Sequence, residues 1–244
     1  MKNLITLSII LMLGFDSYTQ NIQAIKDSET IYFYGYDFTH FKLAEAKRMN
    51  DPVKDYIFGW IGYISEKFSN TNFQENMNKK IISDFDESIK RNKNLDDNLV
   101  TVFVPEPPSE SIYHKIISSY KLKQSEGIGL IVFMEHADKA AETSKIRGIF
   151  FDIQTREILN SIAIISEASG TSMIRHWGKS FVKSMSIFSQ GHYMSSGLKK
   201  EVTGSPCGIK PKKPPKFGNP QYKNSSQYKA YTKKLRIWRN CTGL

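Results

Sequence analysis

The sequence predicts an α/β fold, with α+β as the alternative, in which helices pack against a mixed sheet and a cationic C-terminal extension follows. Three observations predict it. Apolar residues recur with strand or helix periodicity between residues 30 and 188. The two kinds of segment alternate along the chain, and most of the positive charge lies beyond them. We therefore expect a signal peptide over residues 1–19, a single α/β domain over 20–190 and a basic tail over 191–244.

The first predicted elements are a strand and a long helix. Thr30–Tyr36 is a run of β-branched and aromatic residues, typical of a strand, with Gly35 and Asp37 at its end. Pro52 then stands at the start of a helix, a position that proline favours. The apolar residues of this helix step by three or four and so share one face: Val53, Ile57, Ile61, Ile64 and Phe68.

The next segments are less uniform. Lys80–Ile89 fits a strand or a helix, and we favour the strand. Val100–Val104 predicts a strand that is ended by Pro105, Pro107 and Pro108. Ser109 can cap a following helix that runs through Leu122, and the inward face of that helix comprises Ile112, Ile116 and Tyr120.

Three further strands are expected. Gly127–Met134 is typical of a buried central strand, and the polar residues Glu135–Thr143 follow it as a connection. Ile146–Ile153 and Glu157–Ile165 form a hairpin that turns at Gln154–Arg156.

The last helix of the body has the clearest pattern in the chain. Thr171 or Ser172 can cap it after Gly170. Its apolar residues recur at three and four, and they are Ile174, Trp177, Phe181, Met185 and Phe188. Gln190–Lys200 then reads as a linker.

The N-terminus has the pattern of a secretory signal peptide. Lys2 precedes the apolar run Leu4–Phe15, and Ser17 and Thr19 are small enough to stand before a cleavage site. The alternative is a retained anchor, but about twelve apolar residues span roughly 18 Å of a bilayer core of about 30 Å. We expect an exported chain without a transmembrane segment after signal cleavage, in the periplasm, at the outer envelope or outside the cell.

Nearly all of the net charge lies in the tail. Lys199–Leu244 contains ten lysines, two arginines and one acidic residue, whereas Met1–Leu198 is almost neutral. Pro206–Pro220 is typical of an extended spacer, and Tyr228–Trp238 predicts a short helix with an aromatic stripe. The tail thus predicts an anion-binding or partner-binding surface comprising Lys212, Lys213, Lys216, Lys229, Lys233, Lys234, Arg236, Arg239 and Trp238.

The tail leaves two alternatives open. Its aromatic stripe can instead pack on the body, with the lysines facing water. Both cysteines, Cys207 and Cys241, also lie in the tail. In an exported chain they predict a disulfide, and two free thiols are the alternative.

Four short stretches of the body stand out: Tyr34–Phe38, Gly127–Leu130, Phe150–Leu159 and Arg175–Trp177. Together they resemble an uncharacterised family of secreted Bacteroidetes proteins, a resemblance that covers about residues 30–188 and implies no activity. More distantly, the order of elements is similar to the fold of the TolB N-terminal domain, the curli-secretion lipoprotein and the outer-membrane activators of penicillin-binding proteins. Those proteins are envelope adaptors and assembly parts. Their hairpin often has an Asp followed by a turn Gly, where this chain has Arg156.

The sequence predicts no metal site and no cofactor. The histidines occur singly, without metal-ligand spacing, as His40, His114, His136, His176 and His192. Gly127 and Gly129 lie inside a predicted strand, where glycine allows close packing more often than it binds phosphate. Ser169–Ser172 can present N–H groups to an anion, but we favour a helix cap.

Two polar groups are the candidates for chemistry. Glu135, His136 and Asp138 follow the central strand, where α/β proteins often place functional groups, although a solvated loop has the same composition. Asp37, Arg175 and His176 form a comparable set, for which a structural role is the safer assumption.

The leading functional prediction is therefore an exported, non-catalytic envelope adaptor or assembly protein. Its basic tail would bind an anionic envelope surface or an acidic protein, and not nucleic acid. The alternative is a secreted enzyme of unknown reaction with a site near Glu135–Asp138. That alternative requires a deep pocket that joins Glu135 or His136 to another titratable group.

Overall fold

The computed structural model describes residues 22–44, 52–96 and 98–190, together with the backbone of residues 201–203. The predicted signal peptide lies outside the described residues. So do the cysteines and the tail residues of the predicted binding surface, which are Cys207, Lys212, Lys213, Lys216, Lys229, Lys233, Lys234, Arg236, Trp238, Arg239 and Cys241. Their predicted roles stay predictions.

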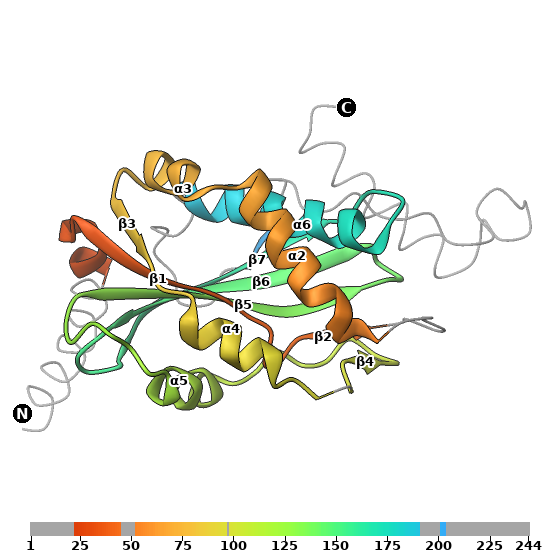
Figure 1. Cartoon of the computed structure of the whole chain (residues 1–244), viewed down its shortest axis with the longest axis horizontal. Coiled ribbons are helices and arrows are strands. Elements are labelled where there is room, and N and C mark those ends of the chain that lie inside the picture. Colours follow the sequence, from red (N-terminus) through yellow and green to blue (C-terminus); the bar gives the residue numbers. More distant parts are fainter. Residues whose placement is uncertain (1–21, 45–51, 97, 191–200, 204–244) are drawn as a thin grey trace, which may run out of the picture.

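The described strands form one mixed sheet, and with the helices they make the α/β fold that the sequence predicts (Figure 1). The sheet order is β3–β1–β5–β6–β7–β8, and β2 pairs with β5 and with β4. β1 lies parallel to β3 and β5, whereas β5, β6 and β7 are antiparallel. The strands are β1 (Thr30–Asp37), β2 (Lys42–Ala44), β3 (Lys80–Ser83), β4 (Val100–Thr101), β5 (Ile128–Asp138), β6 (Thr143–Asp152), β7 (Ile158–Glu167) and β8 (Glu201–Thr203).

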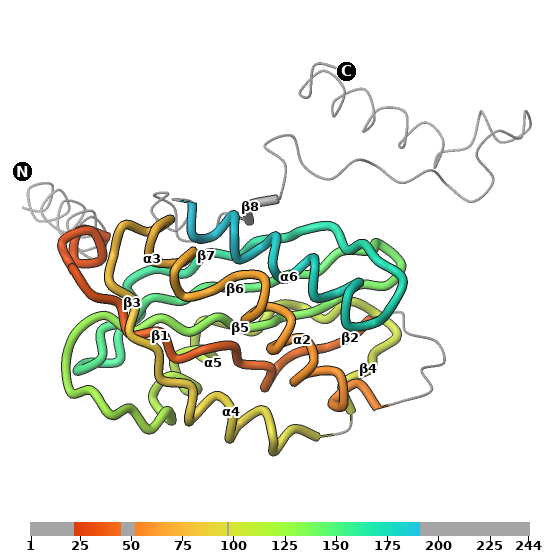
Figure 2. Tube along the Cα trace, turned by 45° about the horizontal axis from the view of Figure 1, so that its top comes forward, coloured from red at the N-terminus to blue at the C-terminus, as the bar shows by residue number. Residues whose placement is uncertain are grey.

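Helices cover both faces of the sheet. After helical backbone at residues 22–27, the helices are α2 (Val53–Lys67), α3 (Asn70–Met77), α4 (Asp86–Lys93), α5 (Glu110–Ser119) and α6 (Met173–Ser189). Helices α2, α3 and α6 contribute to one apolar core and α5 to the other. Figure 2 shows β1 and β5 side by side between these layers.

The larger core lies between the sheet and helices α2, α3 and α6. Trp60 of α2 is buried there and donates a 3.0 Å hydrogen bond from Nε1 to the carbonyl oxygen of Met173. Trp177, Phe181, Met185 and Phe188 of α6 are buried in the same core. The predicted apolar stripes of both helices are thus confirmed at most positions, although Ile174 at the first turn of α6 is exposed.

Helix α6 also approaches the sheet through serine side chains. The Ser180 hydroxyl lies 2.7 Å from that of Ser144 on β6 and 2.9 Å from that of Ser166 on β7. All three side chains are fully buried, and each hydroxyl has a partner. Small polar residues therefore bring the helix close to the strands without leaving unpaired groups in the core.

Several local predictions are confirmed. The first strand, the helix after Pro52 and the hairpin all form where the periodicity indicates. Ser172 caps α6, because its side chain accepts a hydrogen bond from the Arg175 N–H. Gly129 permits close packing, since a Cβ added there would overlap the ring of Phe151.

Other boundaries differ from the predictions. Within the predicted strand Lys80–Ile89, only Lys80–Ser83 is a strand, and α4 begins at Asp86. The side chain of Asn92 in α4 forms hydrogen bonds with the backbone of Tyr36 and Phe38. The strand predicted at Val100–Val104 shortens to β4, because the backbone leaves the sheet after Thr101. Helix α5 buries Tyr113 and Ile117 along with the predicted Ile116, whereas Ile112 is exposed.

The tail also contains a strand that the sequence did not predict. Glu201–Thr203 pairs in parallel with Ala163–Ile165 of β7. The physical reason is that an edge strand offers unpaired backbone groups, which an adjacent extended segment can bind. The tail therefore contains a short segment that is attached to the sheet.

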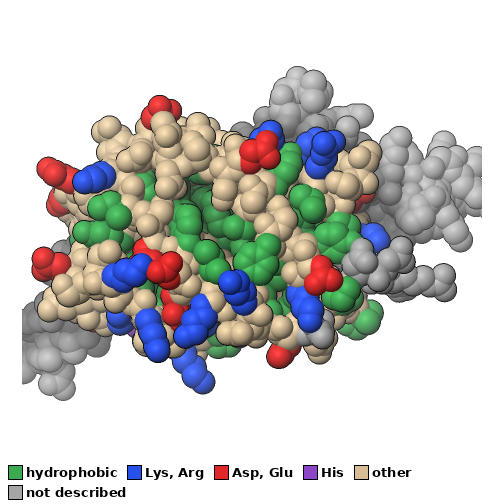
Figure 3. All heavy atoms as spheres, in the orientation of Figure 1, with side chains coloured by type: hydrophobic (Ala, Val, Ile, Leu, Met, Phe, Trp, Pro, Cys, Tyr) green, Lys and Arg blue, Asp and Glu red, His purple; other side chains and the backbone are tan. Residues whose placement is uncertain are grey.

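Charged side chains are unevenly placed on the face shown in Figure 3. They gather along the side of the molecule that carries α4, while apolar side chains show in the centre of that face. Helix α4 contributes acidic residues in its first turn and basic residues in its last turn, an order that matches the helix dipole.

Candidate functional site

The candidate site lies on the α5 face of the sheet, where the smaller core ends. Ile131 and Phe133 of β5 point into this core, and Glu135 continues the same alternation. The pairing of β5 with β6 shifts between Met134 and His136, so Glu135 stands at a β-bulge. Bulges commonly re-aim side chains, and this one sets a carboxylate against two cations of β6.

Glu135 is the centre of a buried charged cluster with Lys145, Arg147 and Tyr113. Its Oε1 accepts hydrogen bonds from Arg147 Nε and, at 2.5 Å, from the Tyr113 hydroxyl. Its Oε2 accepts no hydrogen bond within the part of the chain that the structure describes, although Lys145 Nζ lies 3.4 Å away. Glu135 and Lys145 are each only 3% exposed. We call these four residues the Glu135 cluster.

The cluster fixes the charge of the carboxylate. Burial alone would raise the pKa of Glu135, but the positive charge of Arg147, the Tyr113 hydrogen bond and Lys145 together hold this pKa below its usual value. Burial, followed by the charge of Glu135, raises the pKa of Tyr113. At neutral pH the cluster therefore contains one carboxylate, two cations and a neutral phenol.

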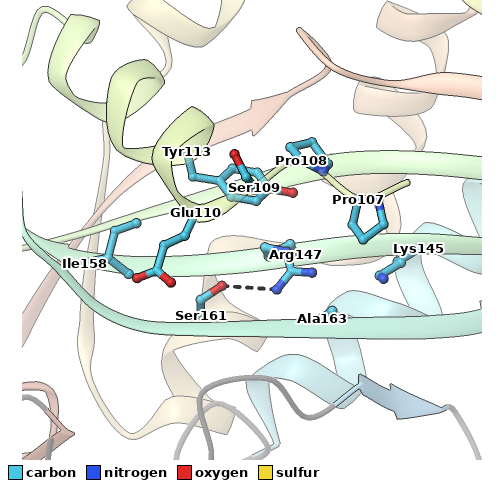
Figure 4. Close-up of a pocket in the computed structure, with 10 residues that line it drawn as sticks. All are labelled: Pro107, Pro108, Ser109, Glu110, Tyr113, Lys145, Arg147, Ile158, Ser161 and Ala163. Atoms are coloured by element: carbon cyan, nitrogen blue, oxygen red, sulfur yellow. Dashed lines mark hydrogen bonds between the residues drawn. The ribbon is translucent and has the colours of Figure 1, made fainter. Parts of the chain in front are cut away.

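A cavity of about 440 Å³ opens beside this cluster (Figure 4). Its polar wall holds Lys145 and Arg147 of β6 and Ser161 of β7, whose hydroxyl accepts a 3.2 Å hydrogen bond from Arg147 Nη1. The opposite wall comes from the start of α5 and the prolines before it. The remaining lining residues are Pro107, Pro108, Ser109, Glu110, Tyr113, Ile158 and Ala163. We call this space the larger cavity.

A smaller cavity of about 200 Å³ shares Pro107 and Pro108 with the larger cavity. It brings His40 and His136 together with Glu106, Lys42 and Glu135. Burial, partly opposed by the charge of Asp37, lowers the pKa of His40. A cavity thus joins Glu135 and His136 to other titratable groups, although the histidines were predicted as isolated residues.

The prediction that Glu135–Asp138 forms a loop is wrong. These residues belong to β5, which continues to Asp138 because β2 and β6 pair with its end. Asp138 itself accepts hydrogen bonds from the N–H groups of Ala140 and Ala141, so its carboxylate shapes the following turn. Glu135 and His136 line the smaller cavity, whereas Asp138 is not part of its lining.

The second predicted set is not brought together either. Asp37 is fully buried and accepts hydrogen bonds from Arg91 Nε at 3.1 Å and the Tyr120 hydroxyl at 2.6 Å. His176 contacts the carbonyl oxygen of Gly170 through Nδ1, and Arg175 is exposed. The structural roles assigned to these residues fit the geometry.

An exposed apolar segment leads into both cavities. After β4, Val102 is 61% exposed and Phe103 is 77% exposed, and the exposed Val104 follows. The next residues, Pro105–Pro108, line one or both cavities. We call Val102–Val104 the apolar segment.

Two types of site are absent from the described part of the chain. Within residues 22–44, 52–96 and 98–190, no group of three or more His, Cys, Asp or Glu side chains is placed to hold a metal ion. No helix in the described ranges has the length and apolar character needed to span a membrane.

Sequence reasoning missed Lys145, Arg147 and Tyr113. A signal was present: Lys145 and Arg147 are two residues apart and flank Ile146 in a β-rich run, so in a strand both cations face one side. Burial of two cations on one strand face requires a carboxylate nearby, and Glu135 was available. No protein-family model matches this chain, and no curated protein matches it.

Proposed function

We propose that the protein is an exported, non-catalytic envelope adaptor, whose body binds a partner protein and whose basic tail binds an anionic envelope component. The observation that carries this proposal is the exposure of the apolar segment, above all of Phe103. Exposed apolar patches on a charged protein surface mark interaction sites. A partner with an apolar surface would remove these side chains from water. This burial contributes about 25 cal/mol of binding free energy per Å² of apolar area.

The chemistry of Glu135 also supports a non-catalytic role. A general base needs a carboxylate that is free to take up a proton. Glu135 is instead bound by Arg147, Tyr113 and Lys145. These partners stabilise the ionised form of the carboxylate and so disfavour its uptake of a proton.

The basic tail supplies the second half of the proposal. Residues 204–244 contain ten Lys and Arg residues and no acidic side chain. Each exposed cation near an anionic membrane contributes about 1 kcal/mol of attraction at low salt. Because β8 pairs with β7, this cationic segment starts at the sheet.

Cell fractionation of the native host tests the adaptor proposal. Deletion of residues 204–244, which leaves β8 in place, should release most of the protein from the envelope fraction, as should raised salt. The double variant Val102→Ser, Phe103→Ser should stay in the envelope fraction, but the partner protein should no longer co-purify with it. Lys179→Ala, an exposed cation of α6, should change neither result. Retention that survives both the deletion and high salt would refute the role of the tail.

A secreted enzyme remains the second candidate, on one observation. The smaller cavity joins His40, His136 and Glu106, which are groups suited to acid–base catalysis near neutral pH. Turnover of ester, peptide or glycoside model substrates that disappears in His136→Ala and His40→Ala would favour the enzyme over the adaptor.

A further inference from the structure

We infer that the larger cavity binds an uncharged peptide segment that carries an apolar side chain. This inference deepens the proposed function and rests on it, because the peptide segment would belong to the partner protein. The apolar segment leads through Pro105 and Glu106 to Pro107 and Pro108 of the cavity wall, so one partner can contact both. Three features of the cavity carry the inference: its balanced charge, its hydrogen-bonding groups and its apolar walls.

The charges around the larger cavity are balanced. Its lining holds two cations, Lys145 and Arg147, and one carboxylate, Glu110. The second carboxylate is Glu135, which pairs with both cations. Lys145 also has a further interaction, so it is assigned no role in binding. Because an ion without a counter-charge is costly to bury, the cavity favours an uncharged ligand.

Two side chains of the sheet can donate hydrogen bonds to a ligand. A guanidinium carries five N–H groups, and Arg147 uses one on Nε for Glu135 and one on Nη1 for Ser161. The Ser161 hydroxyl accepts that bond and donates none to a described residue. Donors therefore remain on the β6 and β7 wall of the cavity.

An acceptor lies on the opposite wall. Glu110 in the first turn of α5 is exposed, and its carboxylate makes no ion pair or hydrogen bond with a described residue. Figure 4 shows Glu110 reaching from α5 toward the strands that carry Arg147 and Ser161. A peptide group matches this arrangement, because its carbonyl oxygen accepts from the strand side and its N–H donates to Glu110.

The remaining walls suit a hydrocarbon side chain. Pro107, Pro108, Ile158 and Ala163 line the cavity together with the ring of Tyr113. A volume of about 440 Å³ lies within the range of ligand pockets, which combine apolar walls with a few convergent polar groups. An apolar residue and its peptide group match this division.

The α5 wall is held to the sheet at two points. Tyr113 donates a hydrogen bond to Glu135 of β5, and Tyr120 donates one to Asp37 of β1. Both acceptor carboxylates are buried. A wall that is fixed before the ligand arrives lowers the ordering cost of binding.

NMR titration of the full chain with four capped peptides tests the inference. Each probe is acetyl-Gly-X-Gly-amide, with leucine, serine, glutamate or lysine as X. The leucine peptide should bind with 1:1 stoichiometry and shift the signals of Ser161 and Ala163. It should bind at least about tenfold more tightly than the other three, which lack the apolar side chain or add a charge. No saturable binding, or equal or tighter binding of a charged peptide, would overturn the inference.

Matched variants locate the site. Ala163→Leu fills the cavity and should weaken binding of the leucine peptide at least about tenfold. Glu110→Ala removes the acceptor and should weaken it at least about threefold. Glu106→Ala is the control, because this exposed carboxylate lines the smaller cavity and not the larger one.

The exposed position of Glu110 keeps the test valid if Ala163→Leu misfolds. Tighter binding by Glu110→Ala, or equal losses in Glu110→Ala and Glu106→Ala, would overturn the inference.

Failure of this inference and failure of the adaptor proposal are distinguishable. If no peptide binds but a partner still co-purifies with the wild type, the adaptor proposal stands and this inference falls. If the leucine peptide binds with the expected pattern but no partner co-purifies, the cavity is a peptide site and the adaptor proposal falls.

Discussion

The hydroxyl group of Tyr113 on α5 donates a 2.5 Å hydrogen bond to Glu135 Oε1 on β5. This bond joins α5 to β5 at the end of the smaller apolar core, where charged side chains replace apolar ones. Arg147 stacks over the Tyr113 ring at 5.5 Å and also binds Glu135. The position of α5, and with it one wall of the larger cavity, thus depends on a polar contact.

Replacing Tyr113 by Phe should destabilise the fold by about 1 to 2 kcal/mol, because a buried hydrogen bond to a charged group is lost while Arg147 still neutralises Glu135. Urea unfolding followed by circular dichroism measures the change. Tyr32→Phe is the control, since Tyr32 packs beside the same core. Equal, negligible effects of the two substitutions would show that the hydroxyl bond contributes little.

Replacing Glu135 by Gln should change the pH dependence of stability. The pKa of Glu135 is below its usual value of 4.5 in the folded protein, so the unfolded chain takes up the proton first on acidification. The stabilisation is complete above pH 4.5 and is lost as pH falls through the folded pKa.

The amide introduced by Glu135→Gln cannot titrate, so the variant should lose less stability than the wild type between about pH 5 and pH 3. At pH 7 it should be less stable by about 3 kcal/mol, because two buried cations lose their counter-charge. Urea unfolding at several pH values measures both effects. Parallel pH profiles for the two proteins would contradict the assigned ion pairs.

Replacing Gly129 by Ala should destabilise the fold by about 1 to 3 kcal/mol, because the new methyl group would overlap the ring of Phe151. Gly62→Ala in α2 is the matched control. A Cβ at Gly62 meets no atom within 4 Å, so this change should stabilise the helix by up to about 1 kcal/mol. Thermal unfolding of both variants should therefore move in opposite directions, and a shift in the same direction would be inconsistent with the packing.

Replacing Arg156 by Gly should stabilise the hairpin. Arg156 has φ of 65°, a left-handed conformation that costs a non-glycine residue about 1 to 2 kcal/mol. Its Nη1 atom is also buried without a hydrogen-bond partner in the described structure. After the entropic cost of glycine, a gain of up to about 1 kcal/mol is expected in urea unfolding. A loss of stability would mean that the Arg156 side chain contributes more than its backbone strain costs.

Regular periodicity made much of the fold predictable. The helix after Pro52 and α6 were found because a single apolar face determines where each helix packs. The hairpin followed from two β-rich runs separated by a short turn. In these elements local preference and tertiary packing agree.

The candidate site was less accessible to sequence reasoning. Glu135 and His136 read as a loop because polar residues rarely occupy a buried strand. The ion pairs of Glu135 with Arg147 and Lys145, which are distant in sequence, make its buried position favourable. The Ser180 contact with Ser144 and the binding of Asn92 to the Tyr36 carbonyl oxygen have no periodic signal at all. Such polar contacts depend on partners distant in sequence, which periodicity does not identify.

The central claim is that the body contacts a partner protein through the apolar segment. Photo-crosslinking from position 103 tests this claim most directly. p-Benzoylphenylalanine replaces Phe103 in one protein and Lys179 in a control, and both are irradiated in the native host. The proposal predicts a discrete crosslinked protein from position 103 that is absent from position 179. No crosslinked protein from position 103, or the same products from both positions, would contradict it.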